Sequence, residues 1–297
     1  MDKNSLSIFS PIPIVLQNSF LGKASCENFP KKSPGALFFF RKHGTIRKID
    51  SILKLQLHPK FTLFMNILYA DGPVLVLNKP SGILVQSPPG IDSLVDQIKN
   101  YVREKEERAP DANVYLGVPH RLDRPASGAM VFARNVRAAK RLSDQFQMRM
   151  ITKKYWVLVQ GIVAPEHGDW EDFLRKVPDE ARAEVVSPHH PEGRWAMLHY
   201  TVRKTFPQRN CTWLEIELET GRTHQIRVQA STRGFPILGD AQYGSSVPFG
   251  EPFEDERLRA IALHSRILEF RHPMREERVH IEAPLPETWR SYLPEEM

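Results

Sequence analysis

Asp123 occupies a short loop between two arginines, and this combination can supply a reactive carboxylate. Its neighbours are Arg121 and Arg124, and the loop continues through Pro125 to Gly128. Because positive charges within a few ångströms lower the pKa of an Asp by about 1–3 units, this carboxylate should stay ionised at neutral pH. An ionised carboxylate can act as a nucleophile or a base. The alternative is a surface turn with a solvated ion pair.

Tyr155 follows Lys153 and Lys154 at the start of an apolar segment, residues 155–159, which predicts a strand. An aromatic ring beside cations can stack on a nucleic-acid base that has left its helix. Taken alone, a tyrosine packed in the core is an equally good interpretation.

Arg227 ends the segment Gly-Arg-Thr-His-Gln-Ile-Arg at residues 221–227, where an amphipathic strand leads into a helix. Ile226 and Ala230 fit the buried face of that helix, so Arg227 stands next to buried positions. From there its guanidinium can reach inward and pair with a carboxylate, bidentately where the geometry allows. An arginine on the surface is the commoner outcome.

The apolar patterns predict an α+β fold that must position these residues. Strands are expected at residues 74–77, 83–85, 129–133, 155–159, 196–202, 214–218, 261–270 and 279–281. Helices are expected at residues 94–102, 138–146 and 223–234. The acidic stretch 161–192 is typical of loops. Since strands outnumber helices and several connections are short, we expect a mixed, largely antiparallel central sheet flanked by helices.

Residues 1–64 differ from the rest of the chain in charge and in pattern. They hold ten Lys or Arg against three Asp or Glu, whereas the rest of the chain holds 31 basic and 32 acidic residues. They contain several prolines and no clean hydrophobic period, which is typical of a poorly ordered segment. We therefore expect a flexible basic extension at 1–64 and a compact domain at 65–297.

The composition of the chain indicates in which cellular compartment the protein works and which classes of partner it could bind. Two cysteines are too few for a disulfide framework or a cysteine metal cluster, and this suits a reducing cytoplasm. No apolar run approaches the roughly 20 residues that span a bilayer. Between His120 and Lys154 there are nine Lys or Arg and two Asp, so this block could bind the phosphates of RNA or DNA. The alternative for such a block is a solvated helix face.

Five short motifs occur in a fixed order along the chain. They are Val-Leu-Asn-Lys-Pro-Ser-Gly at 76–82, His-Arg-Leu-Asp at 120–123, Lys-Lys-Tyr at 153–155, Gly-Arg-Thr-His-Gln-Ile-Arg at 221–227, and Leu-His-Ser at 263–265. Together they resemble the RluA-type RNA pseudouridine synthases, over roughly residues 65–290. Each motif is modestly specific, but five in this order are highly specific. No trace of the S4-type RNA-binding domain that many members carry precedes them.

The resemblance implies a role for each candidate residue in a catalytic domain at 65–297. Asp123 would attack the flipped uridine or trigger elimination at its ribose. Tyr155 would stack on the target uracil, and Arg227 would pair with Asp123. The residues expected to bind substrate are Arg121, Arg124, Lys153, Lys154 and Lys79. Arg121 would fill the space left by the extruded nucleotide, and Lys79 would also support the cleft. The reaction implied needs no metal and no cofactor.

Three functions compete at this point. The first is an RNA pseudouridine synthase acting as a monomer on ribosomal RNA, with transfer RNA as the alternative substrate. The second is a non-catalytic RNA-binding protein on the same fold, which would have no need of a buried charged pair that is costly to desolvate. The third is a glycoside hydrolase, which usually needs a second carboxylate about 5–10 Å away as proton donor. Asp240 is the tempting candidate for that carboxylate, but its context favours a structural role.

Overall fold

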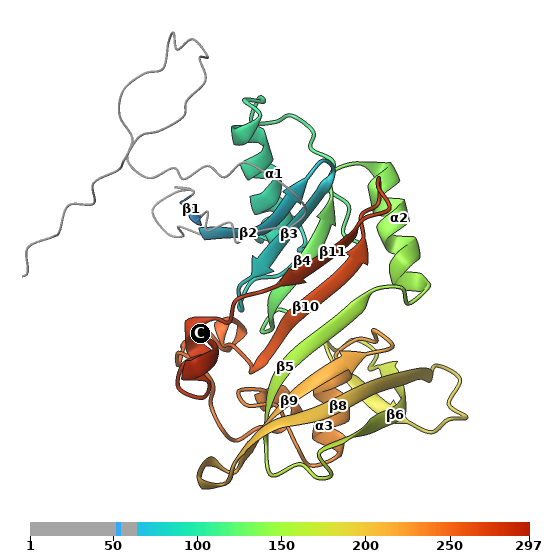
Figure 1. Ribbon diagram of the computed structural model, residues 1–297, viewed down its shortest axis with the longest axis vertical. Coiled ribbons are helices and arrows are strands. Elements are labelled where there is room, and N and C mark those ends of the chain that lie inside the picture. Colours follow the sequence, from blue (N-terminus) through green and yellow to red (C-terminus); the bar gives the residue numbers. More distant parts are fainter. Residues whose placement is uncertain (1–51, 55–63) are drawn as a thin grey trace, which may run out of the picture. The chain divides into compact units, whose positions relative to one another are not determined.

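The structure, a computed structural model, describes residues 52–54 and 64–297 of the chain (Figure 1). Its strands are β1 (Ile52–Lys54), β2 (Phe64–Asp71), β3 (Val74–Lys79), β4 (Ser127–Ala133), β5 (Thr152–Gln160), β6 (His167–Lys176), β7 (Ala183–Val186), β8 (Arg194–Phe206), β9 (Cys211–Leu218), β10 (Leu263–Arg271) and β11 (Arg278–Glu282). Its α-helices are α1 (Leu94–Lys105), α2 (Val136–Gln147) and α3 (Gln225–Thr232).

All of these strands join one sheet. Its order is β1-β2-β3-β4-β10-β5-β9-β8-β6-β7, with β11 paired to β10. Among the described pairs, β4 and β10 run parallel and the others run antiparallel (Figure 1). The prediction of a mixed, largely antiparallel sheet flanked by helices is therefore confirmed.

The parallel pair fixes the end of the Asp123 loop in the centre of the sheet. Ser127 lies opposite His264, and Gly128 lies opposite Ser265. Gly128 has a φ of +117°, and a Cβ atom there would collide with the backbone of Ser265. Only glycine allows β4 and β10 to approach so closely at this point. The loop that bears Asp123 is thereby tied to two strands that are far apart in the sequence.

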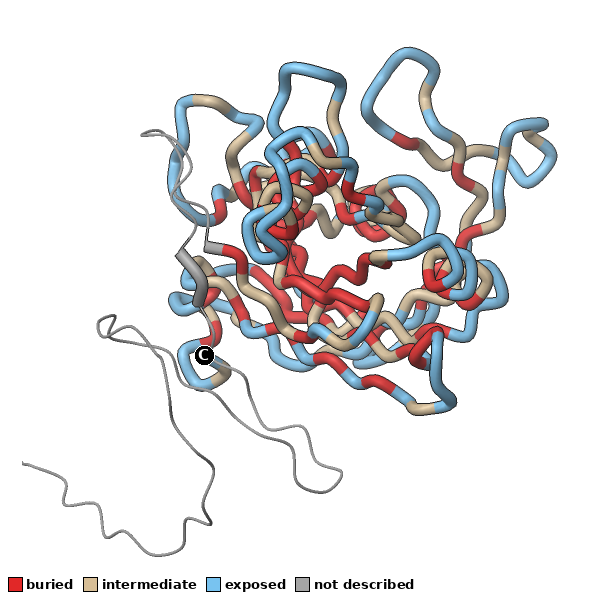
Figure 2. The backbone as a smooth tube through the Cα atoms, turned by 90° about the horizontal axis from the view of Figure 1, so that it is seen from above, coloured by how far each residue is buried: buried red, intermediate tan, exposed pale blue. Residues whose placement is uncertain are grey.

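Both faces of β3 and β4 are buried, which explains their continuous apolar runs. Leu75 and Leu77 join the core cluster that contains Ile98 of α1. Val74 and Val76 alternate with them and join the cluster that contains Leu142 of α2. The two helices thus cover opposite faces of this part of the sheet, and the buried residues gather along its central strands (Figure 2).

The prediction of loops at 161–192 is wrong for residues 167–176 and 183–186, which form β6 and β7, and the rest of this stretch lacks regular structure. Within β6 only Trp170 and Leu174 are buried, and exposed or half-buried residues separate them. The three apolar residues of β6, Trp170, Phe173 and Leu174, fall at helical spacing and do not alternate, so the sequence shows no strand pattern. The strands form because the backbone of β6 pairs with β8 on one side and with β7 on the other. Helix α3 packs on this part, where Val228 contacts the cluster of Leu174 and Ala196.

The prediction of a strand at residues 83–85 is also wrong. The carbonyl of Leu84 accepts from the N–H of Leu94 at 2.8 Å, and that of Val85 accepts from Val95 at 3.1 Å. These donors belong to the first turn of α1, where the N–H groups lack intrahelical partners. The segment therefore completes the start of a helix instead of joining the sheet.

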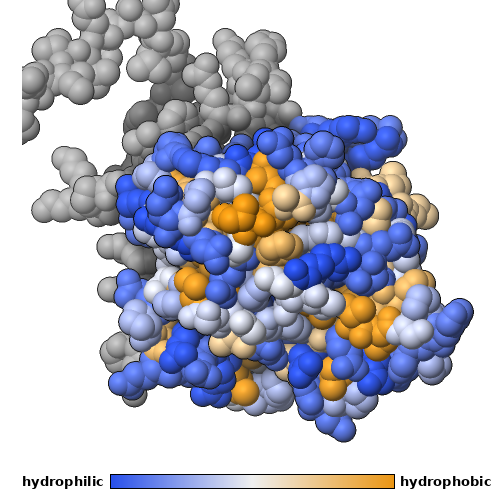
Figure 3. Space-filling model, turned by 90° about the horizontal axis from the view of Figure 1, so that it is seen from below, coloured by the Kyte–Doolittle hydropathy of each residue, from blue (hydrophilic) through white to orange (hydrophobic). Residues whose placement is uncertain are grey.

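The predicted extension at 1–64 is described only at its end. β1 pairs with β2 in antiparallel register, and Phe64 opens β2. The rest of that segment lies outside the described residues. No described helix is long and apolar enough to cross a membrane. On the face shown in Figure 3, hydrophobic residues form small separate patches among hydrophilic ones.

Candidate active site

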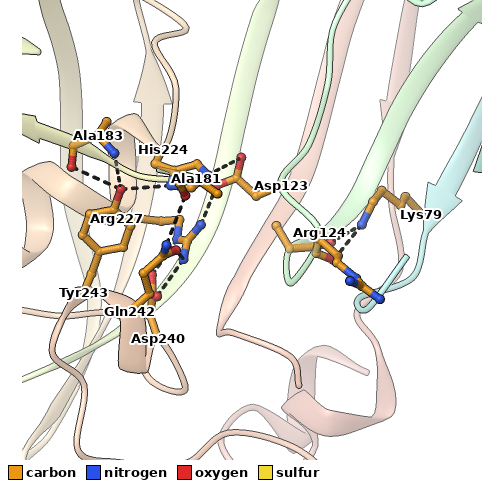
Figure 4. Close-up of polar contacts among 11 residues, drawn as sticks. Lys79, Asp123, Arg124, Ala181, Ala183, His224, Arg227, Asp240, Gln242 and Tyr243 are labelled. Carbon is orange, nitrogen blue, oxygen red and sulfur yellow. Dashed lines mark hydrogen bonds and ion pairs between the residues drawn. The ribbon is translucent and has the colours of Figure 1, made fainter. Parts of the chain in front are cut away.

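The Asp123 carboxylate points from its loop toward the start of α3 (Figure 4). Its side chain is 25% exposed, so a substrate can reach it. The loop closes on itself, since the N–H of Ala126 donates to the carbonyl of Asp123 at 3.2 Å. The strand that follows is buried throughout. The polar loop that bears Asp123 therefore leads directly into a buried strand, which holds its end in place.

Arg227 is the partner that holds this carboxylate. Its Nη1 donates to Oδ2 of Asp123 at 3.3 Å. Its Nε and Nη2 donate to the two oxygens of Asp240 at 2.6 and 2.8 Å. Nη2 also donates to Gln242 at 2.9 Å, and the Arg227 side chain is only 4% exposed. The predicted pairing of Arg227 with a carboxylate therefore appears twice, and the bidentate partner is Asp240.

Two carboxylates keep the buried guanidinium charged. Burial by itself would lower the pKa of Arg227, but hydrogen bonds and charge from Asp240, together with the charge of Asp123, raise it. The bidentate fork fixes the plane of the guanidinium, so its remaining N–H groups point in a defined direction. Asp240 therefore orients Arg227, and Arg227 orients Asp123.

His224 and Tyr243 complete the surroundings of Asp123, and neither was singled out from the sequence. His224 Nε2 lies 3.8 Å from Oδ1 of Asp123, and its Nδ1 lies 2.9 Å from the Tyr243 hydroxyl. That hydroxyl accepts from the N–H of Ala183 at 2.8 Å and also lies 3.3 Å from the carbonyl of Ala183, to which it can donate. Burial lowers the pKa of His224 despite the nearby Asp123 carboxylate, so the ring is neutral at pH 7.

The backbone of His224 is as unusual as its contacts. It is the N-cap of α3 in the left-handed conformation, with a φ of +50°. Non-glycine residues adopt that conformation rarely, and they do so mostly where surrounding structure enforces it. Its position inside the motif at 221–227 was the one available signal for His224. The segment that holds Asp240, Gln242 and Tyr243 has no comparable pattern, and the fold alone brings it to Arg227.

Tyr155 is a buried residue of β5 near the Asp123 carboxylate. It is 7% exposed. Burial raises the pKa of its phenol to about 12, and the charge of Asp123 adds to the increase. The phenol is therefore protonated at neutral pH. This fits an aromatic surface at the floor of a site, and the predicted stacking role stays a prediction.

Lys79 was expected to bind substrate, but the structure places it beneath the loop. It is fully buried, and its Nζ donates to the carbonyls of Pro80, Arg124 and Ala126 at 2.9, 3.1 and 2.7 Å. Two of these carbonyls, those of Arg124 and Ala126, follow Asp123 closely in the sequence (Figure 4). A buried ammonium cannot touch RNA in this arrangement, so Lys79 fixes the backbone of the loop.

Arg124 also fixes the backbone of the loop, through two hydrogen bonds with Gly82 of the first motif. Its Nε donates to the carbonyl of Gly82 at 2.9 Å, and its own carbonyl accepts from the N–H of Gly82 at 2.8 Å. The first motif and the Asp123 loop are therefore joined by reciprocal bonds. Arg121 differs, because its side chain is exposed and has no partner among the described residues. It is the arginine that is free to reach a substrate.

Lys153 and Lys154 lie on opposite faces of β5, because side chains alternate along a strand. Lys153 shares the face of Tyr155. Lys154 lies 3.6 Å from carboxylate oxygens of both Glu215 and Glu217. The arrangement supports Lys153 as a substrate contact and gives Lys154 acidic partners on the other face.

The described residues contain no group of three or more His, Cys, Asp or Glu placed to hold a metal ion. Asp240 was considered as a proton donor for glycoside hydrolysis. Its side chain is 1% exposed and both of its oxygens accept bonds from Arg227. A carboxylate in that bidentate pair is an acceptor and has no proton to give. Asp240 therefore cannot serve as the proton donor that the glycoside hydrolase hypothesis requires.

Comparisons with known proteins show the family of this chain. A family model described as RNA pseudouridylate synthase matches residues 73–232. A ribosomal large subunit pseudouridine synthase D of Haemophilus ducreyi is 36% identical over 230 residues, which cover 75% of this chain and 67% of that protein. A ribosomal large subunit pseudouridine synthase C of Buchnera aphidicola is 31% identical over 252 residues, covering 82% of this chain and 75% of that protein.

Solved structures share the fold. The human protein RNA pseudouridylate synthase domain containing 4 superposes with a TM-score of 0.61 at 23% identity, covering 77% of this chain and 92% of that one. At this identity the likeness concerns the arrangement of strands and helices alone.

Proposed function

This chain belongs to the RNA pseudouridine synthase family, and we propose that it isomerises uridines of ribosomal RNA with Asp123 as the catalytic residue. The observation that supports the role of Asp123 is its hydrogen bond to Arg227, which the buried Asp240 orients. A partly exposed carboxylate held by a fixed cation is ionised, oriented and accessible at once. A protein that only binds RNA has no need of such an arrangement.

The proposed reaction uses only groups of this chain and of the RNA. The target uridine leaves its helix, which costs a few kcal/mol, and its uracil stacks on Tyr155. The Asp123 carboxylate either attacks C1′ of the ribose or removes a proton and triggers elimination. The N1–C1′ bond breaks, the uracil turns, and a C5–C1′ bond forms. On the first route the bond between Asp123 and C1′ breaks as C5 bonds to C1′, and on the second route the proton that Asp123 removed returns to the ribose. C5 loses a proton and N1 gains one, so the isomerisation needs no oxidant, reductant or second substrate.

Ribosomal RNA is the proposed substrate because the relatives from Haemophilus and Buchnera are named as ribosomal large subunit enzymes. Transfer RNA is the alternative. We further propose that residues 65–297 form the catalytic domain, that residues 1–64 are an extension, and that the protein works in the cytoplasm as a monomer. Deleting residues 1–64 tests the division, since the shortened chain should keep its activity.

The test is to map pseudouridines across ribosomal and transfer RNA from cells that carry either the wild-type protein or Asp123→Asn. We expect one or a few ribosomal sites to disappear in Asp123→Asn. Asp111→Asn is the matched control, because Asp111 is exposed and has no side-chain partner among the described residues. If the sites that disappear lie in transfer RNA alone, transfer RNA is the substrate instead of ribosomal RNA. Sites retained by Asp123→Asn, in cells where deleting the whole chain removes them, would contradict the catalytic role of Asp123.

A further inference from the structure

Two arginines contact Trp195, and a third precedes it in β8, outside the residues already assigned to the site. The guanidinium carbon of Arg149 lies 5.0 Å from the centre of the Trp195 ring. The Nε of Arg222 donates to the carbonyl of Trp195 at 2.9 Å. Arg194 is the preceding residue on β8, and all three arginine side chains are exposed. These residues come from the turn after α2, from β8 and from the segment before α3.

This cluster adjoins Asp123 by two routes. Arg222 is two residues before His224, which contacts Asp123. Lys153 is two residues before Tyr155 and shares its face of β5. Burial lowers the pKa of Lys153, and the charge of Arg149 lowers it further, which places Arg149 near Lys153. An RNA strand whose uridine enters the site would therefore pass close to the three arginines.

The cluster has more positive charge than its carboxylates can neutralise. Arg149 pairs with Glu219 at 3.0 Å. Among the described residues, the side chains of Arg194 and Arg222 donate to backbone carbonyls and to no carboxylate. Burial lowers the pKa of Arg222, and the charges of Arg149 and Arg194 lower it further. Like charges held together repel one another, and a bound anion would relieve the repulsion.

Arg149 also stands where the backbone favours glycine. It follows the C-cap of α2 with a φ of +56°. Its N–H donates to the carbonyl of Phe146, and the N–H of Met150 donates to that of Gln145. These two bonds define the Schellman motif, in which the left-handed position is usually glycine. An arginine is disfavoured there, so replacing it by glycine should remove the side chain without straining the backbone.

We propose that Arg149, Arg194 and Arg222 form a subsite that binds a phosphate of the RNA backbone next to the flipped uridine, with Trp195 holding Arg149 in place. Arginine suits this role because its planar fork donates two parallel hydrogen bonds to phosphate. The indole fixes the guanidinium before RNA arrives, which reduces the ordering cost on binding. The subsite rests on the RNA-modifying activity of the family and does not depend on whether the RNA is ribosomal.

The chain offers a matched pair of variants for the test. Helix α1 ends in the same motif, where Glu107 has a φ of +52°. Its N–H donates to the carbonyl of Glu104, and the N–H of Arg108 donates to that of Arg103. Both Arg149→Gly and Glu107→Gly therefore place the favoured residue at a left-handed position. Neither variant should lower the melting temperature, so a change in RNA binding cannot come from unfolding.

The experiment measures the affinity of the full chain for a fluorescein-labelled, single-stranded RNA of mixed sequence at several salt concentrations. Arg149→Gly should weaken binding by about threefold to tenfold at moderate salt. Each lost phosphate contact should reduce the slope of log K against log salt by about 0.7 for a single strand. Arg194→Gln should reduce the slope similarly, whereas Glu107→Gly should not weaken binding.

Unchanged salt slopes in both Arg149→Gly and Arg194→Gln would overturn the proposal. An equal loss of affinity in Glu107→Gly would overturn it as well, because the loss would then follow the backbone change. Binding to the labelled RNA does not depend on product formation. A chain that shows the expected slopes but modifies no ribosomal uridine would therefore contradict the proposed substrate and support the subsite.

Discussion

The Asp123 loop is held from two sides by contacts of different kinds (Figure 4). On the α3 side, Arg227 and His224 contact the carboxylate itself, and Asp240 and Tyr243 hold these two residues from behind. On the β3 side, Lys79 donates only to backbone carbonyls, two of them in the loop and one at Pro80. One side orients the reactive group and the other fixes the chain that bears it. Changes on the two sides should therefore differ in whether activity or stability is lost first.

The largest effect after Asp123→Asn should come from Arg227→Leu. The variant leaves Asp240 buried without a partner, which should lower the free energy of unfolding by about 3–5 kcal/mol. It also frees the Asp123 carboxylate, and misplacing a catalytic group by about 1 Å can reduce the rate by about a hundredfold. Urea denaturation and single-turnover pseudouridine formation measure the two effects.

The double variant Arg227→Leu/Asp240→Leu separates these effects. Replacing a buried ion pair by apolar residues is often neutral or stabilising, so stability should recover toward the wild-type value. Activity should stay low, because Asp123 still lacks its partner. Recovery of activity together with stability would show that Arg227 acts only through folding. The α3 side would then stabilise the loop, as the β3 side does, and would not orient the carboxylate.

Lys79→Met should affect stability more than orientation. It leaves three backbone carbonyls beneath the loop without their donor, at a cost of about 1–3 kcal/mol for a buried group. The residual protein should keep the pairing of Asp123 with Arg227, so its kcat should fall less than that of Arg227→Leu. Urea denaturation and kcat, measured on the same preparation, test both statements.

The stability difference between wild type and Lys79→Met should also depend on pH. Burial lowers the pKa of Lys79 from 10.5 to about 7. Between these values the unfolded chain binds more protons at this residue than the folded chain, so the contribution of Lys79 to stability rises with pH. That contribution is complete above the unfolded pKa and is lost as the pH falls through about 7. A difference that stays constant from pH 7 to about pH 10 would rule out this titration.

On the α3 side, His224→Gln should have a smaller effect than Arg227→Leu. A contact at 3.8 Å across a partly exposed site contributes about 1 kcal/mol or less, so kcat should fall by about fivefold or less. Because burial keeps His224 neutral at pH 7, the wild type should lose activity only when the pH falls below the lowered pKa of the imidazole. In His224→Gln that step in the pH profile should be absent. If the pH profile of His224→Gln equals that of the wild type, His224 takes no part in the reaction.

The residues that the sequence predicted differ from those it missed in one physical respect. Asp123 and Arg227 lie in motifs, and the family resemblance that these motifs carry was sufficient to pair them. Asp240 reaches Arg227 through tertiary structure, and no local pattern marks it. The burial of Lys79 was equally hidden, because a lysine at a strand end usually keeps its ammonium in water. Motifs therefore identified the reactive pair, and the fold was needed to find what holds it.

The placement of Lys153 and Lys154 on opposite faces of β5 could have been predicted from the alternation of side chains along a strand. Variants of these two lysines should give the smallest change in kinetics. Lys153→Gln should raise the KM for RNA by about twofold to fivefold with little change in kcat, because one cation is lost on the face of Tyr155. Lys154→Gln should change neither constant, since this lysine already neighbours Glu215 and Glu217 on the other face. Steady-state kinetics of the two variants on the same RNA compare the faces directly. Equal increases in KM would mean that RNA reaches both faces of β5.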